Sequence, residues 1–388
     1  MNYITNPFKT KSSIVNRQNV FLHNTNLWGI AMDIGYSAVK GFAPNKVFCF
    51  PAFAKKVTSV PSLGTAGEYD IVYTDMETGE IWLVGEAGQK LQDSREAQST
   101  LYGRNRYFSP VFRIISAVGL GIGLLNNEFG KSDGRKPVIQ TGLPPAYIKG
   151  DTSLIKEALS GHYHFTLKIG SSAPVTFDFY IEEDSVHVMP QPMGTLFSIA
   201  TASNGQQILD AKKYFASNML ILDPGFGTLD IFNIRNRYIE SYETYDDLGM
   251  RAIFERTVNE IYRRFNTEIS VPALQMYLES GEITVSDRRR HLTEKKSFAS
   301  ILQEQNEAVC KEALGRLDTL FDNLVNYDYL VVTGGTGAAW LSYIKEYYKG
   351  MQTLQIIPGT QNDSLSSVYA NVRGYYLYMY GKVKRGDY

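Results

Sequence analysis

The chain has 388 residues, 44% of them hydrophobic, and its 39 Lys and Arg residues nearly balance 40 Asp and Glu residues, giving a formal net charge of −1. This composition excludes a disordered chain and argues against a protein that binds nucleic acid or an acidic membrane through a basic surface. The length favours two domains or one large α/β body. The two cysteines, Cys49 and Cys310, are too few for a disulfide framework, so we expect a reducing cytoplasm.

Neither a membrane span nor a signal peptide is expected. The longest apolar run, Ile114 to Leu125, is too short to cross a bilayer, and no apolar segment with a cleavage site opens the chain. Residues 1–25 are polar and contain no acidic residue, so they are expected to form an extension outside the core, with only 20–22 as candidates for docking.

The first half alternates strand and helix patterns. Periodicity and turn residues predict strands at 27–34, 38–43, 137–143, 162–169 and 175–181, a β-meander over 57–88, and helices over 110–125 and 153–159. The second half repeats this order. We expect strands at 219–222, 228–234, 239–244 and 329–333, a glycine turn at 334–337, and helices over 249–265, 298–324, 338–348 and 364–384. Each half is therefore expected to be a mixed β-sheet flanked by helices.

The two halves share one device, an apolar strand that ends in Asp-x-Gly, a tight turn and a second apolar strand. The copies are Asp33-Ile34-Gly35 and Asp223-Pro224-Gly225. This repetition predicts a duplicated fold of two lobes with a cleft between them. We place a polar extension at 1–25, the first lobe at 26–212 with a terminal helix at about 364–388 packing back on it, and the second lobe at 213–363.

Such a hairpin is suited to holding a phosphate. Its turn exposes backbone N–H groups, and its glycine lets a phosphate approach the main chain. The aspartate would repel a phosphate, but a hydrated Mg²⁺ between them removes the conflict, because this ion keeps several waters and takes few protein ligands. Lys40, on the returning strand, could pair with a phosphate. A single Asp-x-Gly hairpin is common for structural reasons, whereas two in matching contexts indicate a polyphosphate site.

A third candidate segment runs from Val331 to Ala339 and contains Gly334-Gly335-Thr336-Gly337 between a buried strand and a helix. Its glycines would permit backbone contact with a base or a ribose, and a helix N-terminus favours an anion. No Walker-type phosphate loop is present in the sequence, and the opening hairpin does not fit a dinucleotide-binding fold.

Taken together, these three segments resemble the nucleotide-contact segments of the actin-like ATPases, which include actin, the ATPase domain of heat-shock chaperones and sugar kinases. The matching residues are Asp33, Gly35, Tyr36, Ser37, Ala38 and Lys40; Asp223, Gly225, Phe226, Gly227, Thr228 and Asp230; and Gly334 to Gly337. Further segments are similar to the ParM/Alp plasmid-segregation actins: 141–144 with 161–164, 189–194 and 370–375.

The resemblance implies an actin-like, ribonuclease H-like duplicated α/β fold with a nucleotide cleft between its lobes. It implies that Asp33 and Asp223 hold the waters of Mg²⁺, that Asp223 and Gln191 orient the attacking water, and that the glycine segments contact the nucleotide. In the family's order, Gly35, Tyr36, Ser37 and Lys40 would contact the β-phosphate, Gly225, Phe226, Gly227 and Thr228 the γ-phosphate, and Gly334, Gly335, Thr336 and Gly337 the adenosine.

The implied function is that of a bacterial cytoplasmic ATPase that polymerises and moves plasmid DNA through a ParR-like DNA-binding adaptor. Its implied cofactors are ATP and Mg²⁺, with GTP left open, and its implied partners are further copies of itself and the adaptor, without direct nucleic-acid or membrane binding. Two alternatives remain: a small-molecule kinase of the same fold, which needs a catalytic base for a substrate hydroxyl, and a chaperone-like ATPase module.

Other conspicuous residues have simpler structural interpretations. Asp230 is expected to fix its hairpin rather than to contact Mg²⁺, and His162 with His164 to serve packing or surface roles. The basic residues at 288–291 and 295–296 are expected in a solvated loop between helices.

Overall fold

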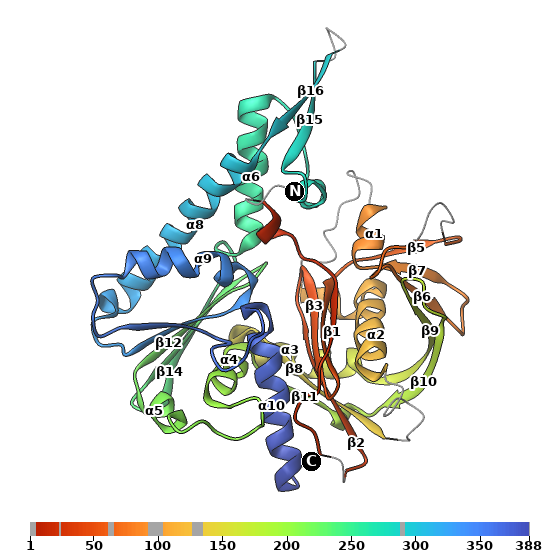
Figure 1. The fold of residues 1–388 in the computed structure, drawn as a ribbon, viewed down its shortest axis with the longest axis horizontal. Helices are drawn as coiled ribbons and strands as arrows, with labels where there is room; N and C mark the ends of the chain where they lie inside the picture. The colour runs from red at the N-terminus through yellow and green to blue at the C-terminus, as the bar shows by residue number, and fades with distance from the viewer. Residues whose placement is uncertain are drawn as a thin grey trace. The chain divides into compact units, whose positions relative to one another are not determined.

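A computed structural model describes residues 5–22, 25–60, 66–91, 104–125, 135–287 and 292–387 (Figure 1). Its contacts divide the chain into two compact units. Unit 1 contains the described parts of 1–10 and 216–358, and unit 2 contains the described parts of 11–92, 99–215 and 359–388. None of the described helices is long and apolar enough to cross a membrane.

The central sheet of unit 2 is mixed, in the order β1-β4-β3-β2-β8-β11. Its strands are β1 (Ser13–Asn16), β2 (Leu27–Ile34), β3 (Ala38–Ala43), β4 (Lys46–Pro51), β8 (Lys136–Leu143) and β11 (Val186–Pro190). The strands predicted at 27–34 and 38–43 are confirmed at both ends. β8 and β11 run parallel to β2, whereas β1, β3 and β4 are joined antiparallel.

Helices cover both faces of this sheet, which explains why β2 is apolar along nearly its whole length. In Figure 1, α2 (Pro110–Leu124) lies on one face and α10 (Ala370–Arg385) on the other. Ile30 and Met32 belong to the core that includes α2, and Ala31 belongs to the core that includes α10. Glycines let α2 approach closely: a Cβ at Gly123 would lie 2.9 Å from Ile30.

Unit 2 also contains an antiparallel sheet in the order β10-β9-β6-β7-β5. Its strands are β5 (Ala54–Val57), β6 (Ile71–Asp75), β7 (Ile81–Val84), β9 (Gly161–Ile169) and β10 (Val175–Ile181). The remaining helices of the unit include α1 (Glu86–Lys90), η2 (Arg104–Phe108), α3 (Ile148–Leu159) and α4 (Gln191–Ala200); α5 (Ala211–Ala216) leads to the boundary with unit 1.

Unit 1 is built on a second mixed sheet, in the order β14-β13-β12-β17-β18. Its strands are β12 (Met219–Pro224), β13 (Leu229–Arg235), β14 (Tyr238–Tyr245), β17 (Tyr329–Val332) and β18 (Gln355–Pro358). The helices are α6 (Met250–Phe265), α7 (Val271–Tyr277), α8 (Ala299–Leu320) and α9 (Gly334–Tyr347). In the core, the indole N–H of Trp340 on α9 donates to the Asn306 side chain on α8 at 2.9 Å.

The N-terminal segment differs from the polar extension expected for residues 1–25. Phe8 is buried in the core of unit 1, and the Thr5 hydroxyl donates to the Leu278 carbonyl at 2.5 Å. Further along, β1 extends the central sheet of unit 2 by pairing with β4. The Asn19 amide then donates to the Ala43 carbonyl at 2.7 Å. These contacts join residues far apart in sequence, so the local polarity of the segment could not indicate them.

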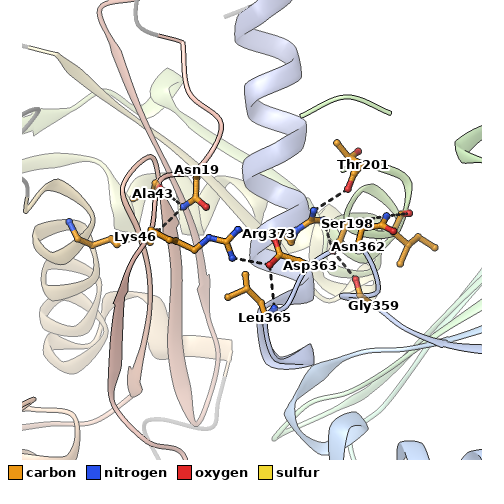
Figure 2. A network of polar contacts seen from close by, with 12 residues as sticks. Asn19, Ala43, Lys46, Ser198, Thr201, Gly359, Asn362, Asp363, Leu365 and Arg373 are labelled. Atoms are coloured by element: carbon orange, nitrogen blue, oxygen red, sulfur yellow. Dashed lines mark hydrogen bonds and ion pairs between the residues drawn. The ribbon is translucent and has the colours of Figure 1, made fainter. Parts of the chain in front are cut away.

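A buried arginine fixes α10 against α4 (Figure 2). Arg373 has 0% exposure and donates to Asp363 at 3.0 Å, to the Ser198 carbonyl at 2.7 Å and to the Thr201 carbonyl at 3.1 Å. Asp363 also accepts a hydrogen bond from Arg17 at 2.8 Å, which ties the N-terminal segment to the same point. The network therefore holds the end of α4, whose first residue is Gln191.

Three local expectations need correction. The glycines at 334–337 form the first turn of α9, because tertiary packing overrides their low helix propensity. The last helix begins at Ala370, after the short helix η7 (Ser367–Tyr369), rather than at 364. Lys295 and Lys296 lie on a hairpin of β15 (Glu282–Asp287) and β16 (Leu292–Ser297), not in a loop between helices; residues 288–291 lie outside the described residues.

Candidate functional site

The two Asp-x-Gly hairpins have the same main-chain geometry. The Gly35 N–H donates to the Ala38 carbonyl at 2.9 Å, and the Gly225 N–H donates to the Thr228 carbonyl at 2.8 Å. Each aspartate is buried near the end of its first strand, with 4% exposure for Asp33 and 5% for the second copy. Each glycine turn therefore follows a carboxylate that the sheet holds in place.

In unit 2, three predicted residues meet at one carboxylate. Lys40 lies directly opposite Asp33 in the β2–β3 ladder, and its Nζ is 2.9 Å from Asp33 Oδ2. The Gln191 amide, at the start of α4, donates to Asp33 Oδ1 over a long 3.4 Å. Lys40 therefore neutralises the Asp33 carboxylate, and this carboxylate orients the Gln191 amide. Tyr36 and Ser37 complete the turn between the two strands.

Arg106, which no sequence pattern indicates as a site residue, contacts this turn. The guanidinium carbon of Arg106, on η2, lies 4.3 Å from the centre of the Tyr36 ring. Its Nη2 donates to the Ile34 carbonyl. No spacing or motif relates Arg106 to the first hairpin, since more than sixty residues separate them, so the sequence carried no signal for this contact.

In unit 1, the second and third predicted segments pack on each other. Gly334 has a φ of 77°, and a Cβ there would lie 2.6 Å from Asp223 Oδ1 and 2.8 Å from the Pro224 carbonyl oxygen. The Thr336 hydroxyl donates to the Gly225 carbonyl at 3.0 Å. The structure therefore brings the glycine-rich start of α9 against the Asp223 hairpin, and only glycine fits at its first position.

The start of α6 supports the same turn. The backbone N–H of Met250 donates to the Gly225 carbonyl at 3.0 Å, and that of Arg251 donates to the Phe226 carbonyl at 2.8 Å. A Cβ at Gly249 would lie 2.5 Å from the Phe226 carbonyl oxygen. Gly249 was expected only as the beginning of a helix, and the structure shows that its lack of a side chain admits the turn. Gly227 and Thr228 follow within this supported loop.

One ladder position distinguishes the two hairpins. Asp230 lies opposite Asp223, as Lys40 lies opposite Asp33. Burial raises the pKa of Asp230 to about 7, and the Asp223 charge adds to this effect. Asp230 accepts a hydrogen bond from Thr228 at 3.1 Å, which fixes its hairpin as expected, and one from Thr244 at 2.6 Å, which also joins the hairpin to β14.

The residues present fit a magnesium nucleotide. Within the described residues, no group of three or more His, Cys, Asp or Glu side chains could hold a metal ion by itself. Single buried carboxylates suit Mg²⁺, which retains most of its waters. The buried Thr333 hydroxyl, directly before Gly334, has no hydrogen-bond partner. An unsatisfied buried hydroxyl beside a glycine turn is consistent with a polar ligand.

The comparisons with known proteins point to one fold. Residues 31–194 match the family described as "Actin like proteins N terminal domain". The chain is similar to the structure "pCBH ParM non-polymerisable quadruple mutant", with 19% identity and a TM-score of 0.68, over 92% of this chain and 99% of that one.

Two further structures are similar over most of their lengths. The apo psk41 ParM protein is 18% identical with a TM-score of 0.61, over 94% of this chain and 99% of that one. Ta0583, an archaeal actin homolog in complex with ADP, is 15% identical with a TM-score of 0.62, over 92% and 99%. No curated protein matches the sequence. The predicted actin-like fold is therefore confirmed.

Proposed function

We propose that this protein is a filament-forming ATPase of the ParM/Alp type. Its residues 31–194 match the actin-like N-terminal domain, and its fold is actin-like. Among its structural relatives, one is a filament of Alp12, one is the Bacillus thuringiensis ParM with ATP, and one is Ta0583 with ADP. Carried over to this chain, these properties give a protein that binds ATP and assembles with copies of itself.

The repeated hairpin is the observation that carries this proposal. Two buried aspartates, each followed by a glycine turn with the same N–H to carbonyl hydrogen bond, are each suited to a phosphate with its hydrated Mg²⁺. Asp33 and Asp223 would hold waters of the ion. Mg²⁺ would supply positive charge that neutralises the phosphate oxygens during transfer.

The remaining residues position the nucleotide and the water. Gly35 to Ser37 with Lys40, and Gly225 to Thr228, would contact phosphates; Gly334 to Gly337 would line the adenosine. The Gln191 amide cannot abstract a proton, but it can orient a water together with Asp223. Its hydrogen bond to Asp33 restricts the rotation of the amide. Positioning and charge neutralisation then account for the catalysis.

The cellular role extends the same proposal. We assign unit 2 to the first actin-like lobe and unit 1 to the second. Hydrolysis in filaments would exceed that in free subunits, because assembly would stabilise the closed form of the site. A ParR-like adaptor would connect the filament to plasmid DNA in the bacterial cytoplasm. Retention of a plasmid that carries the gene, compared between wild type and Asp223→Ala in dividing cells, tests this role.

The biochemical test is right-angle light scattering with Mg²⁺ and ATP, followed by negative-stain microscopy of the same sample. Wild type should form filaments that decay as phosphate is released. Asp223→Ala should form filaments that persist, because hydrolysis is lost. Asp184→Ala, which removes an exposed aspartate far from either hairpin in sequence, should behave as wild type. Absence of scattering at all concentrations, with hydrolysis that depends on an added hydroxyl compound, would instead identify a kinase.

A further inference from the structure

Arg106 holds the first glycine turn on both sides of Gly35. Its guanidinium carbon is 4.3 Å from the centre of the Tyr36 ring, and its Nη2 donates to the Ile34 carbonyl. Residues 34 and 36 flank the glycine, so one planar cation contacts the backbone before the turn and the side chain after it. A lysine could not make both contacts, since it lacks the planar fork of arginine.

Aromatic rings surround the guanidinium. Besides Tyr36, the ring of Phe112 lies 5.4 Å from the guanidinium carbon and that of Tyr107 lies 5.9 Å from it. In the described part of the chain, no carboxylate forms an ion pair with Arg106, and Asp33, the carboxylate whose charge acts on Arg106, is itself paired with Lys40. Burial accordingly lowers the pKa of Arg106. A half-buried cation that has no bonded carboxylate among the described residues favours the arrival of an anion.

The short helix η2, which carries Arg106, is anchored directly after this residue. The Tyr107 hydroxyl donates to Asp151 on α3 at 3.1 Å, and Asp151 is only 1% exposed. Two residues later, the Ser109 hydroxyl accepts the Phe112 N–H at 3.1 Å and so caps α2. η2 and the start of α2 therefore hold the Arg106 guanidinium in position. From this position, the guanidinium can fix the conformation of the first glycine turn.

We propose that Arg106 is a positioning residue for the phosphate groups of the nucleotide: through Tyr36 and the Ile34 carbonyl it sets the conformation of the first glycine turn, and its charge favours a polyphosphate there. This inference rests on the proposed function. It predicts that loss of Arg106 weakens binding of ATP and ADP, whereas binding of adenosine, which has no phosphate, is unchanged.

The chain offers a matched control on α2. The guanidinium carbon of Arg113 lies 4.1 Å from the Tyr163 ring centre, and its nitrogens donate to the carbonyls of Ser160 at 3.2 Å and His162 at 2.6 Å. Arg113 thus has the same kind of ring and carbonyl contacts as Arg106, in the same unit, but none with a glycine turn of the candidate site.

The test is a competition assay with a fluorescent ADP analogue, below the concentration at which filaments form. ATP, ADP and adenosine compete in turn for wild type, Arg106→Gln, Arg106→Lys and Arg113→Gln, and the melting temperature of each protein is recorded. We expect Arg106→Gln to raise Kd for ATP and ADP about tenfold, in the range of a partly desolvated cation–π contact, while changing that for adenosine less than twofold. Arg106→Lys should recover part of the loss, and Arg113→Gln should bind as wild type.

Two results would overturn the inference in different ways. The first arises if wild type binds ATP and Arg106→Gln either binds it equally well or loses affinity for ATP and adenosine alike, in parallel with a lower melting temperature. Arg106 then has a structural role only, and the proposed function stands. If wild type binds none of the three ligands, the proposed function and this inference both fail.

Discussion

Replacing Gly334 by alanine tests the packing of α9 on the Asp223 hairpin. The new methyl group would lie 2.6 Å from Asp223 Oδ1 and 2.8 Å from the Pro224 carbonyl oxygen, both closer than real Cβ atoms approach. The second atom belongs to the backbone of β12, so it cannot move without shifting the strand. The residue would also have to keep a φ of 77°, in the left-handed region.

These two effects give an expected magnitude. The left-handed conformation costs a residue with a Cβ about 1–2 kcal/mol. Crowding in a well-packed interior adds about 1–3 kcal/mol. We therefore expect Gly334→Ala to lower the free energy of unfolding of the protein by about 2–5 kcal/mol. Because the displaced atom is a carboxylate oxygen of Asp223, binding of Mg²⁺–ATP should weaken as well.

Urea unfolding followed by circular dichroism measures the first effect, and nucleotide titration measures the second. Gly79→Ala is the matched control, because Gly79 has a φ of 71° but no heavy atom within 4 Å of its added Cβ. It should lose only the conformational part, about 1–2 kcal/mol, and bind nucleotide normally. Equal losses for the two variants would refute the argument that Gly334 makes room for Asp223.

Two further predictions concern buried charges. Arg373→Met removes the cation that holds Asp363 and two carbonyls of the α4 end, so stability should fall by about 3–5 kcal/mol in urea unfolding, whereas Arg385→Met, at an exposed ion pair, should change it little. Asp230, whose pKa burial raises to about 7, takes up a proton in the folded state that the unfolded chain releases near pH 4. Its contribution to stability is therefore full below pH 4 and is lost as pH rises towards 7, a slope that Asp230→Asn should remove when unfolding is measured across this range.

The sequence predicted those strands and turns whose residues are neighbours along the chain. The strands at 27–34 and 38–43 were predicted to the residue because an apolar run, a Gly-Tyr-Ser turn and a second apolar run stand next to each other. The opposition of Asp33 and Lys40 follows from the same hairpin. The pairing of β1 with β4 could not be predicted in this way, because two half-exposed and two exposed residues gain their partners at least thirty residues later.

The candidate site shows the same limit. The carboxylates and glycines of both hairpins carry their own sequence pattern, so they were found. Arg106 has no such pattern, since its contacts to Tyr36 and Ile34 exist only after η2 packs against the hairpin. Gly334 was predicted to lie in a glycine turn, whereas it begins α9, and the close approach to Asp223 that requires a glycine cannot be inferred from the sequence.

Trp340, whose indole N–H is hydrogen-bonded to Asn306, can report on its surroundings through its fluorescence. Of its three tryptophans, Trp28 and Trp82 lie in unit 2 and Trp340 alone lies in unit 1, fully buried on the helix that begins at Gly334. With the two others replaced by phenylalanine, the remaining indole would be the single source of tryptophan emission. If α9 moves when a nucleotide binds at the glycine segment, the emission wavelength would then change without any attached dye.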